Sequence, residues 1–193
     1  RAKDSDDKTQ ESLLKMFTLY NNANPLEALR QLHVVPLSIS YEYDPCDYLK
    51  AKEFQLKRDQ PGYKKTQADD IENMATGITG YKGRVSFRLG KGINDALGSI
   101  PPETGRNEVL RHAASLIDNE IYRNYTFFPI NYVAYDRMTG SRAFAHEYTG
   151  DDRARFDEYL QQQVDEVDSP GKDNDFLRSK IVGRCGNAGK NHG

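Results

Sequence analysis

One stretch decides the predicted fold: Val34-Val35-Pro36-Leu37-Ser38-Ile39-Ser40-Tyr41, followed by Glu42-Tyr43-Asp44-Pro45. From residue 37 onward apolar and polar side chains alternate, which predicts a β-strand with one apolar and one polar face. Pro36 has no backbone N–H to donate, so it belongs at the strand entry or beside a gap in the pairing.

Helical patterns flank this strand on both sides. Leu26, Leu29 and Leu32 repeat at helical spacing before it, and Asp44-Pro45 is typical of a helix start after it. An α–β–α passage of this kind is typical of a mostly parallel sheet. We therefore expect an α/β fold in which amphipathic helices cover a small, mostly parallel sheet.

A second strand is predicted over residues 83–90, with Val85, Phe87 and Leu89 turned inward. The polar side chains that alternate with them favour a half-exposed position towards the edge of the sheet.

The polar face of the first strand has two interpretations. In the first, Ser38, Ser40 and Glu42 line a cleft at the carboxyl end of the strand. In the second, the serines merely tolerate a partly wet face.

Further helices are expected over residues 10–20, 66–76, 106–122 and 151–167, with Leu13, Leu14, Phe17, Ile71 and Met74 buried. The expected helix starts are Asn24 as the cap before Pro25, a capping box of Thr66 and Asp69, and Asp151 or Asp152 as the cap of the helix that ends at residue 167. Residues 122–135 carry six aromatic side chains in a run expected to be extended or irregular. These aromatics either pack under the sheet or reach lipid head groups. Residues 1–168 are predicted to form one domain, and residues 169–193 a flexible, glycine-rich tail with a short helix candidate over residues 175–182.

Composition narrows the class of protein. A net charge of −2 over 193 residues gives no basic field for nucleic acid, and no apolar run is long enough to span a bilayer. Cys46 and Cys185 are too far apart in sequence to form a metal pair or a secreted disulfide framework, so we expect a reducing, cytoplasmic setting and no metal. The chain begins at Arg1 rather than at Met, and we expect that Arg1 is not the natural start.

The histidines give little catalytic signal. His146 and Asp151 form a His-x-x-x-x-Asp pair, in which a carboxylate can orient an imidazole as a base. With four histidines in the chain, this spacing can arise by coincidence. No glycine-rich phosphate loop, zinc spacing or nucleophile elbow is present.

Two segments resemble a known family: the opening 1–10 and the long run 34–48. They look like the C-terminal half of the glycerolipid acyltransferase superfamily, in the 1-acylglycerol-3-phosphate acyltransferase-like branch of bacterial "acyltransferase" or "hemolysin" proteins. Val35-Pro36-Leu37 is similar to the fourth block of that family, and Arg1 resembles the residue after its Glu-Gly pair. The similarity continues through residues 44–52 and 73–84.

The resemblance implies transfer of a fatty acyl group from acyl-CoA or acyl carrier protein to a glycerol-phosphate or lysophospholipid hydroxyl. It implies no other cofactor, and a peripheral place at the inner face of the cell membrane. Arg1 and Lys3 are expected to bind the acceptor phosphate. The resemblance also implies that Pro36, Ser38 and Ser40 belong to the strand of the acceptor pocket. The family's catalytic His-x-x-x-x-Asp block lies upstream of these segments, so no catalytic residue is assigned in this chain and His146 is not given that role.

Two other classes stay open. In the first, the chain is a non-catalytic domain that binds a lipid surface or a protein through residues 122–135. In the second, the chain is an enzyme in which His146 acts as a base beside Asp151.

Overall fold

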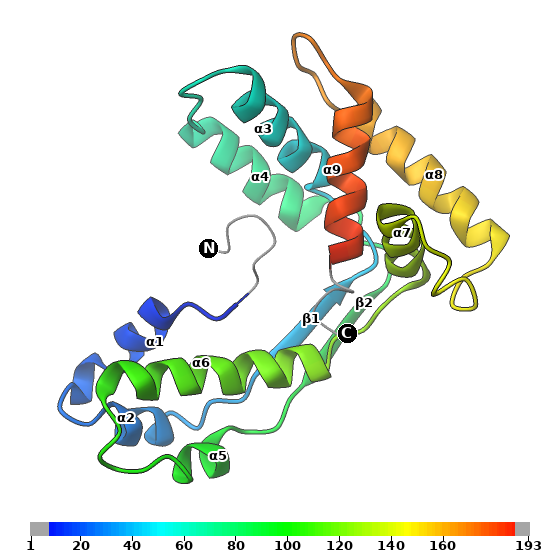
Figure 1. Ribbon diagram of the computed structural model, residues 1–193. Coiled ribbons are helices and arrows are strands. Elements are labelled where there is room, and N and C mark those ends of the chain that lie inside the picture. Colours follow the sequence, from blue (N-terminus) through cyan, green and yellow to red (C-terminus); the bar gives the residue numbers. More distant parts are fainter. Residues whose placement is uncertain (1–7, 188–193) are drawn as a thin grey trace. The chain divides into compact units, whose positions relative to one another are not determined.

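The computed structural model describes residues 8–187 (Figure 1). Its elements, in order, are α1 (Glu11–Phe17), the 3-10 helix η1 (Leu19–Asn21), α2 (Pro25–Gln31), β1 (Leu37–Tyr41), α3 (Asp47–Asp59), α4 (Gln67–Thr79), β2 (Val85–Leu89), α5 (Asn94–Gly98), α6 (Arg106–Arg123), α7 (Pro129–Thr139), α8 (Gly150–Asp165) and α9 (Asn174–Asn187).

The described chain divides into two compact units where a single domain was expected. Residues 8–40 and 86–126 form the first unit, and residues 41–85 and 127–187 form the second. Both boundaries fall inside the strands, between residues 40 and 41 and between 85 and 86.

Local sequence signals place several helix starts. Asn24 caps α2 by accepting a hydrogen bond from the Glu27 N–H at 3.0 Å, with Pro25 in the first turn as predicted. The predicted capping box of Thr66 and Asp69 opens α4. The N-cap of α8 is Thr149 instead of an aspartate, because its hydroxyl accepts from the backbone N–H of the third helical residue.

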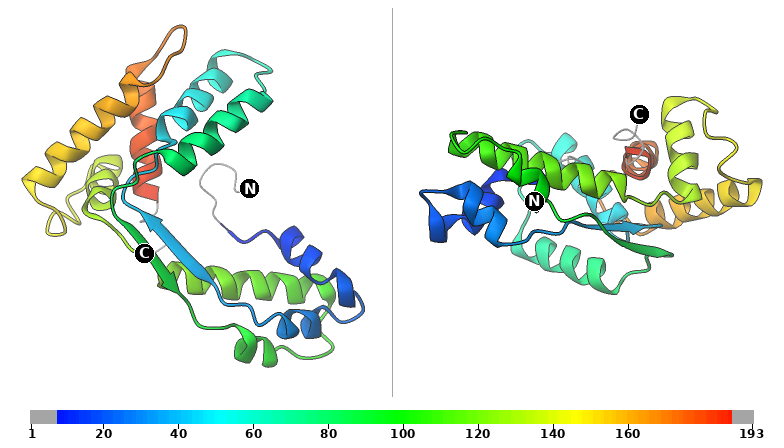
Figure 2. Two further views of the ribbon diagram at one scale, coloured as in Figure 1. Left: turned by 180° about the vertical axis from the view of Figure 1, so that it is seen from behind. Right: turned by 90° about the horizontal axis from the view of Figure 1, so that it is seen from below.

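β1 and β2 form a two-stranded antiparallel sheet, and they lie side by side in every view (Figure 1, Figure 2). The expectation of a mostly parallel sheet is wrong for the described residues. The Gly90 N–H donates to Pro36 O at 2.8 Å, and the Glu42 N–H donates to Arg84 O at 2.9 Å. Both bonds belong to one register, which places Leu37 opposite Leu89, Ile39 opposite Phe87 and Tyr41 opposite Val85.

The core of the first unit is built by α1, α2, α5 and α6. Its buried members come from one side of each helix and include Leu14, Leu29, Leu97, Val109 and Ala113. The regular apolar spacing of residues 106–122 therefore predicted its longest helix, α6, correctly.

The core of the second unit is built mainly by α7, α8 and α9, with Ala51 from α3. α9 contains the helix candidate predicted over residues 175–182 and continues to residue 187, through a segment that was expected to be a flexible tail. Leu177 and Ile181 on it are fully buried. α7 likewise occupies the end of the aromatic run, which was expected to be extended or irregular. Its first residue is Pro129, whose fixed φ suits the first helical turn.

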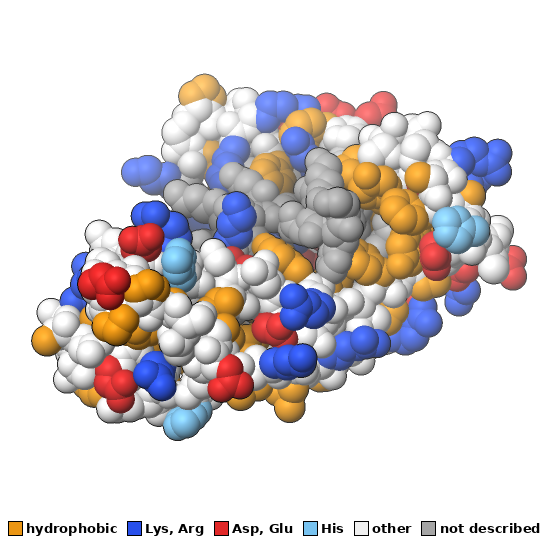
Figure 3. Space-filling view, turned by 60° about the horizontal axis from the view of Figure 1, so that its bottom comes forward, with side chains coloured by type: hydrophobic (Ala, Val, Ile, Leu, Met, Phe, Trp, Pro, Cys, Tyr) orange, Lys and Arg blue, Asp and Glu red, His pale blue; other side chains and the backbone are white. Residues whose placement is uncertain are grey.

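Two helices turn apolar residues to the surface that the sequence placed inside. In α1 only Leu14 is buried, whereas Leu13 and Phe17 are exposed. In α4 Ile71 and Met74 are exposed, and Asn73 is the buried residue. Hydrophobic side chains also reach the surface in the space-filling view, among the charged ones (Figure 3). The helical periods were right, but the buried side was predicted wrongly.

Candidate functional site

The polar face of the sheet is the buried one. Ser40 is 1% exposed, and its hydroxyl accepts a hydrogen bond from the Thr126 N–H at 3.0 Å. Opposite it, the Ser86 hydroxyl lies 2.9 Å from the Thr126 hydroxyl. Thr126 follows the end of α6, so this short segment satisfies the serines and covers them. The sequence could not show that a distant threonine would take this place.

Pro36 and Ser38, the other two predicted pocket residues, are also buried. Pro36 O accepts the Gly90 N–H, which places the proline at the strand entry as predicted. The Ser38 hydroxyl has no hydrogen-bond partner among residues 8–187. Neither of the two hollows described below is lined by these three residues. Their role in an acceptor pocket therefore stays a prediction.

The apolar face of the sheet consists, within the first unit, of Leu37, Ile39, Phe87 and Leu89. Their exposed fractions are 43%, 39%, 65% and 72%. The two pairs are directly opposed across the strands, in the positions where antiparallel side chains lie closest. The inward orientation predicted for Phe87 and Leu89 is wrong, because the hydrogen bonds to Thr126 bury the other face.

A buried ionic cluster lies in the second unit, where α3 begins beside α8 and α9. Asp47 is 1% exposed and accepts hydrogen bonds from Arg184 Nε at 2.8 Å and from the Tyr159 hydroxyl at 2.8 Å. A carboxylate oxygen of Asp44 forms ion pairs with Lys50 Nζ at 2.8 Å and with a guanidinium nitrogen of Arg184 at 2.9 Å. One arginine thus bridges both carboxylates.

The two carboxylates of this cluster have opposite pKa shifts. Burial raises the pKa of Asp47, and the negative charge of Asp44 adds to the rise, against the effect of Arg184. Burial also acts to raise the pKa of Asp44, but Lys50, the Cys46 N–H and Arg184 together outweigh it and lower that pKa. Burial further raises the pKa of the Tyr159 hydroxyl and of the Cys185 thiol.

These contacts favour a structural role for the cluster. The Cys185 thiol lies 3.4 Å from an Asp47 oxygen, and its raised pKa makes it a poor nucleophile at neutral pH. Asp47 also has its carboxylate oxygens engaged by donors, which leaves it little capacity to accept a proton from a substrate. The cluster joins α3, α8 and α9 through these contacts.

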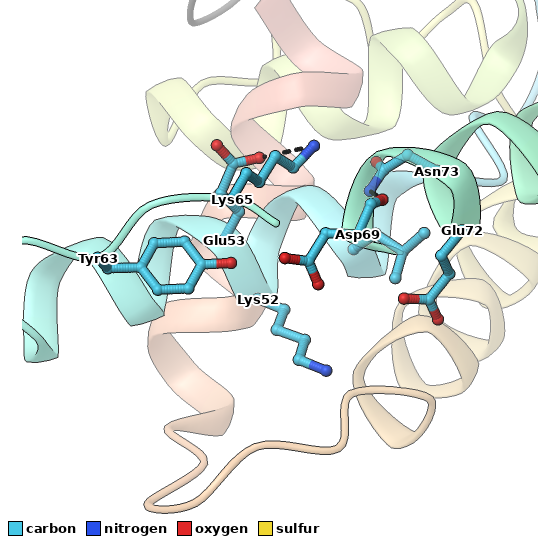
Figure 4. A pocket seen from close by; sticks show the side chains of 8 residues that line it. Lys52, Glu53, Tyr63, Lys65, Asp69, Glu72 and Asn73 are labelled. Carbon is cyan, nitrogen blue, oxygen red and sulfur yellow. Dashed lines mark hydrogen bonds and ion pairs between the residues drawn. The ribbon is translucent and has the colours of Figure 1, made fainter. Parts of the chain in front are cut away.

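A small hollow lies between α3 and α4 (Figure 4). Lys65 and Glu53 line this hollow and form an ion pair of 3.3 Å, and Lys52, Tyr63 and Asp69 line it as well. Its volume of about 20 Å³ gives room for one water molecule. A substrate does not fit there.

A wider, open hollow of about 460 Å³ lies in the first unit beside His33, Val35 and Lys91. His33 has a φ of 49°, the left-handed region that non-glycine residues rarely adopt. Its Nδ1 lies 3.0 Å from Asn94 Nδ2, so the amide fixes the imidazole with Nδ1 as the acceptor. Among the described residues that line it, His33, Lys91 and Asp95 carry titratable side chains, and no hydrogen bond or ion pair joins one of them to another.

The remaining predicted residues are Arg1, Lys3 and the pair His146 and Asp151. Arg1 and Lys3 lie outside the described residues. His146 is exposed, and its ion pair is with Glu147 at 3.3 Å instead of with Asp151, which lies in the first turn of α8.

The aromatic run is covered. None of its six aromatic side chains is classed as exposed: Tyr122, Tyr125, Phe127, Phe128, Tyr132 and Tyr135. Tyr132 and Tyr135 both contact the Phe144 ring, at centroid distances of 5.3 Å and 5.2 Å.

Sequence reasoning missed Asp44, Asp47 and Arg184 as partners. Asp44 was taken as a helix cap, whereas it accepts the Cys46 N–H and the helix starts at Asp47. The helix predicted over residues 175–182 stopped short of Arg184, whereas α9 runs to residue 187 and brings Arg184 into the fold. Gly183 and Gly186 beside Arg184 favoured a flexible tail over a continued helix.

The comparisons with known proteins found no match to a family model, to a curated protein or to a solved structure. Among residues 8–187 no helix combines the length and the apolar character needed to cross a bilayer. The same residues contain no group of three or more histidine, cysteine, aspartate or glutamate side chains that could hold a metal ion.

Proposed function

We propose that this chain is part of a glycerolipid acyltransferase and that the His-x-x-x-x-Asp pair of the enzyme lies outside these 193 residues. The chemistry comes from the resemblance of residues 34–48 to that superfamily. The observation that supports the structural half of the proposal is the exposed apolar face of the sheet.

The two apolar pairs on the exposed sheet face, Leu37 with Leu89 and Ile39 with Phe87, are in contact with water at a cost in free energy. A side chain such as Phe or Leu gains about 1.5–3 kcal/mol when it is fully buried, and soluble monomers rarely leave large contiguous apolar patches open. Phe87 and Leu89 are more than half exposed, and Ile39 and Leu37 stand opposite them. A sheet with this face is expected to be covered in the active enzyme.

Exposed apolar stripes on two helices support the same interpretation. Leu13, Met16 and Phe17 are exposed on α1 in the first unit. Ile71, Met74 and Ile78 are exposed on α4 in the second unit, at the i, i+3, i+7 spacing of a helix that packs on a neighbour. Each unit therefore presents apolar surface that a larger protein would bury.

The reaction proposed is acyl transfer. The histidine takes the proton of the acceptor hydroxyl, the oxygen attacks the thioester carbonyl, and the acyl group leaves sulfur for oxygen as the thiol is released. The acyl donor is acyl-CoA or acyl carrier protein, and the acceptor is glycerol 3-phosphate or its monoacyl form. Pro36, Ser38 and Ser40 are proposed to support the acceptor pocket from the buried side of β1. The enzyme is proposed to work at the inner face of the cell membrane.

The test is thiol release from acyl-CoA and from acyl carrier protein, with glycerol 3-phosphate and 1-acylglycerol 3-phosphate as acceptors. The polypeptide encoded by the complete gene is expected to turn over, and the 193-residue chain alone is expected to be inactive. Robust turnover by the 193-residue chain, or none by the complete gene product with either donor, would contradict the proposal.

The aromatic segment 122–135 is a weaker candidate for function. Its rings contact one another and their neighbours, and none is classed as exposed. No observation favours a lipid- or protein-binding role for it over packing.

A further inference from the structure

We propose that the outer edge of β1 receives an additional β-strand from the acyltransferase polypeptide outside these 193 residues. This inference rests on the function proposed above and adds which edge of the sheet makes the contact and through which backbone groups.

The register of the sheet shows where the backbone groups of β1 point. In an antiparallel pair, every second residue exchanges hydrogen bonds with the partner strand, and the residues between them direct N–H and C=O to the other side. The bond from the Gly90 N–H to Pro36 O sets this alternation. The N–H and C=O groups of Leu37 and Ile39 therefore point away from β2, and no third strand of residues 8–187 receives them.

Pro36 does not spoil this edge. It belongs to a hydrogen-bonded position, so its missing N–H is on the side of β2. The outward row at alternate residues, Val35, Leu37 and Ile39, keeps all of its donors and acceptors.

β2 is a poorer edge for a new strand. It carries Arg88 and is preceded by Arg84, and charged side chains on an edge strand hinder pairing with another strand. Its apolar side chains are also more exposed than those of β1. Phe87 is 65% and Leu89 72% exposed, whereas Ile39 opposite Phe87 is 39% and Leu37 opposite Leu89 is 43% exposed. These features mark β2 as the outermost strand and leave β1 as the edge that can extend.

The buried side of β1 offers an independent observation. Ser38 is 1% exposed, and its hydroxyl has no partner among the described residues. A strand paired with the outer edge of β1 would place a side chain beside Ser38 on the same face of the sheet. A polar side chain there could satisfy the hydroxyl, while apolar side chains on the other face would extend the row of Leu37 and Ile39. The occupant is thus an extended segment with alternating polar and apolar residues.

Residue-resolved amide exchange tests the proposal without relying on acyl transfer. In the 193-residue chain the Ile39 amide is expected to exchange quickly, because its N–H faces the open edge. In the polypeptide encoded by the complete gene it is expected to exchange at least about tenfold more slowly, because it donates to the added strand. Phe87 is the matched control: its N–H faces the outer edge of β2 and is expected to stay fast in both.

Two proline variants sharpen the result. Ile39→Pro removes an outward N–H from β1 without removing a bond to β2, and Phe87→Pro does the same on the outer edge of β2. In the complete gene product Ile39→Pro is expected to lower the thermal midpoint more than Phe87→Pro does. Equal exchange of Ile39 in both polypeptides, protection of Phe87 in its place, or a complete gene product with no further strand overturns the proposal. If Ile39 is protected but no acyl transfer is detected, the proposed function fails while the strand contact stands.

Discussion

The first unit exposes the apolar side chains of Ile39 and Phe87, whereas the second unit buries the carboxylate of Asp47. In both regions, hydrogen bonding decides which side of an element is covered. The serines of the sheet are covered because Thr126 bonds to them, and Asp47 is covered because Arg184 and Tyr159 bond to it. The comparison teaches that hydropathy alone does not set burial in this protein, because Ser40 and Asp47 lie inside with polar partners while Ile39 and Phe87 stay exposed.

The largest contrast is expected between two phenylalanines. Phe156 on α8 is fully buried, so Phe156→Ala should lower the free energy of unfolding by about 4 kcal/mol through lost packing and the cavity it leaves. Phe87→Ala on the apolar face should change it by less than about 0.5 kcal/mol. Urea unfolding of both variants measures this. A loss of similar size for Phe87→Ala would mean that its ring is covered.

Removal of Arg184 should be nearly as damaging. Arg184→Met leaves Asp47 buried without its positive partner, which should lower the free energy of unfolding by about 3 kcal/mol. The control on the same helix is Arg178→Met, since Arg178 bonds to Gln161 at the surface and should lose less than about 1 kcal/mol. Equal losses would show that the cluster does not stabilise the fold.

The contributions of Asp44 and Asp47 to the free energy of unfolding should depend on pH in opposite directions. The folded-state pKa of Asp44 is lowered, so its ionised form adds stability at neutral pH that is lost as the pH falls through that value. Asp44→Asn should lower the free energy of unfolding by about 1–2 kcal/mol at neutral pH and by less near pH 3.

Asp47 should respond in the opposite direction. Its folded-state pKa is raised, so its contribution is largest in acid and falls as the pH rises through the raised value. The loss caused by Asp47→Asn should therefore be larger in acid than at neutral pH. Chemical unfolding of both variants over about pH 3–7 provides the measurement, and parallel curves would refute the opposite shifts.

The smallest contrast is expected between two serines on one face of β1. Ser40→Ala leaves the buried Thr126 N–H without its acceptor and should lower the free energy of unfolding by about 1–2 kcal/mol. Ser38→Ala removes a hydroxyl that has no partner and should be neutral or slightly stabilising in the 193-residue chain. A large loss for Ser38→Ala would show that its hydroxyl is bonded in solution.

Local structure could be predicted because its causes are close in sequence. Asn24 with Pro25, and Thr66 with Asp69, start helices through bonds that span three residues. The alternation in residues 37–41 likewise gave a strand, and the spacing in residues 106–122 gave α6. These parts of the fold need no distant residue.

The candidate site was predicted less well, because its contacts are long-range. Ser40 meets Thr126 across 86 positions, and Asp47 meets Arg184 across 137. A pattern of alternating residues gives two faces but does not show which one a neighbour will cover, so the inward sides of β2 and α4 were predicted wrongly.

The sequence by itself determined many of the helical and extended segments, several of their caps, and the two-faced character of the strands, because these depend on side chains within a few positions. Only the tertiary structure decided that the sheet is antiparallel, that its serines lie inside, and that Arg184 joins Asp44 to Asp47. The physical reason is that a buried polar group is costly without a hydrogen-bond partner, and the partners of Ser40 and Asp47 come from far parts of the chain.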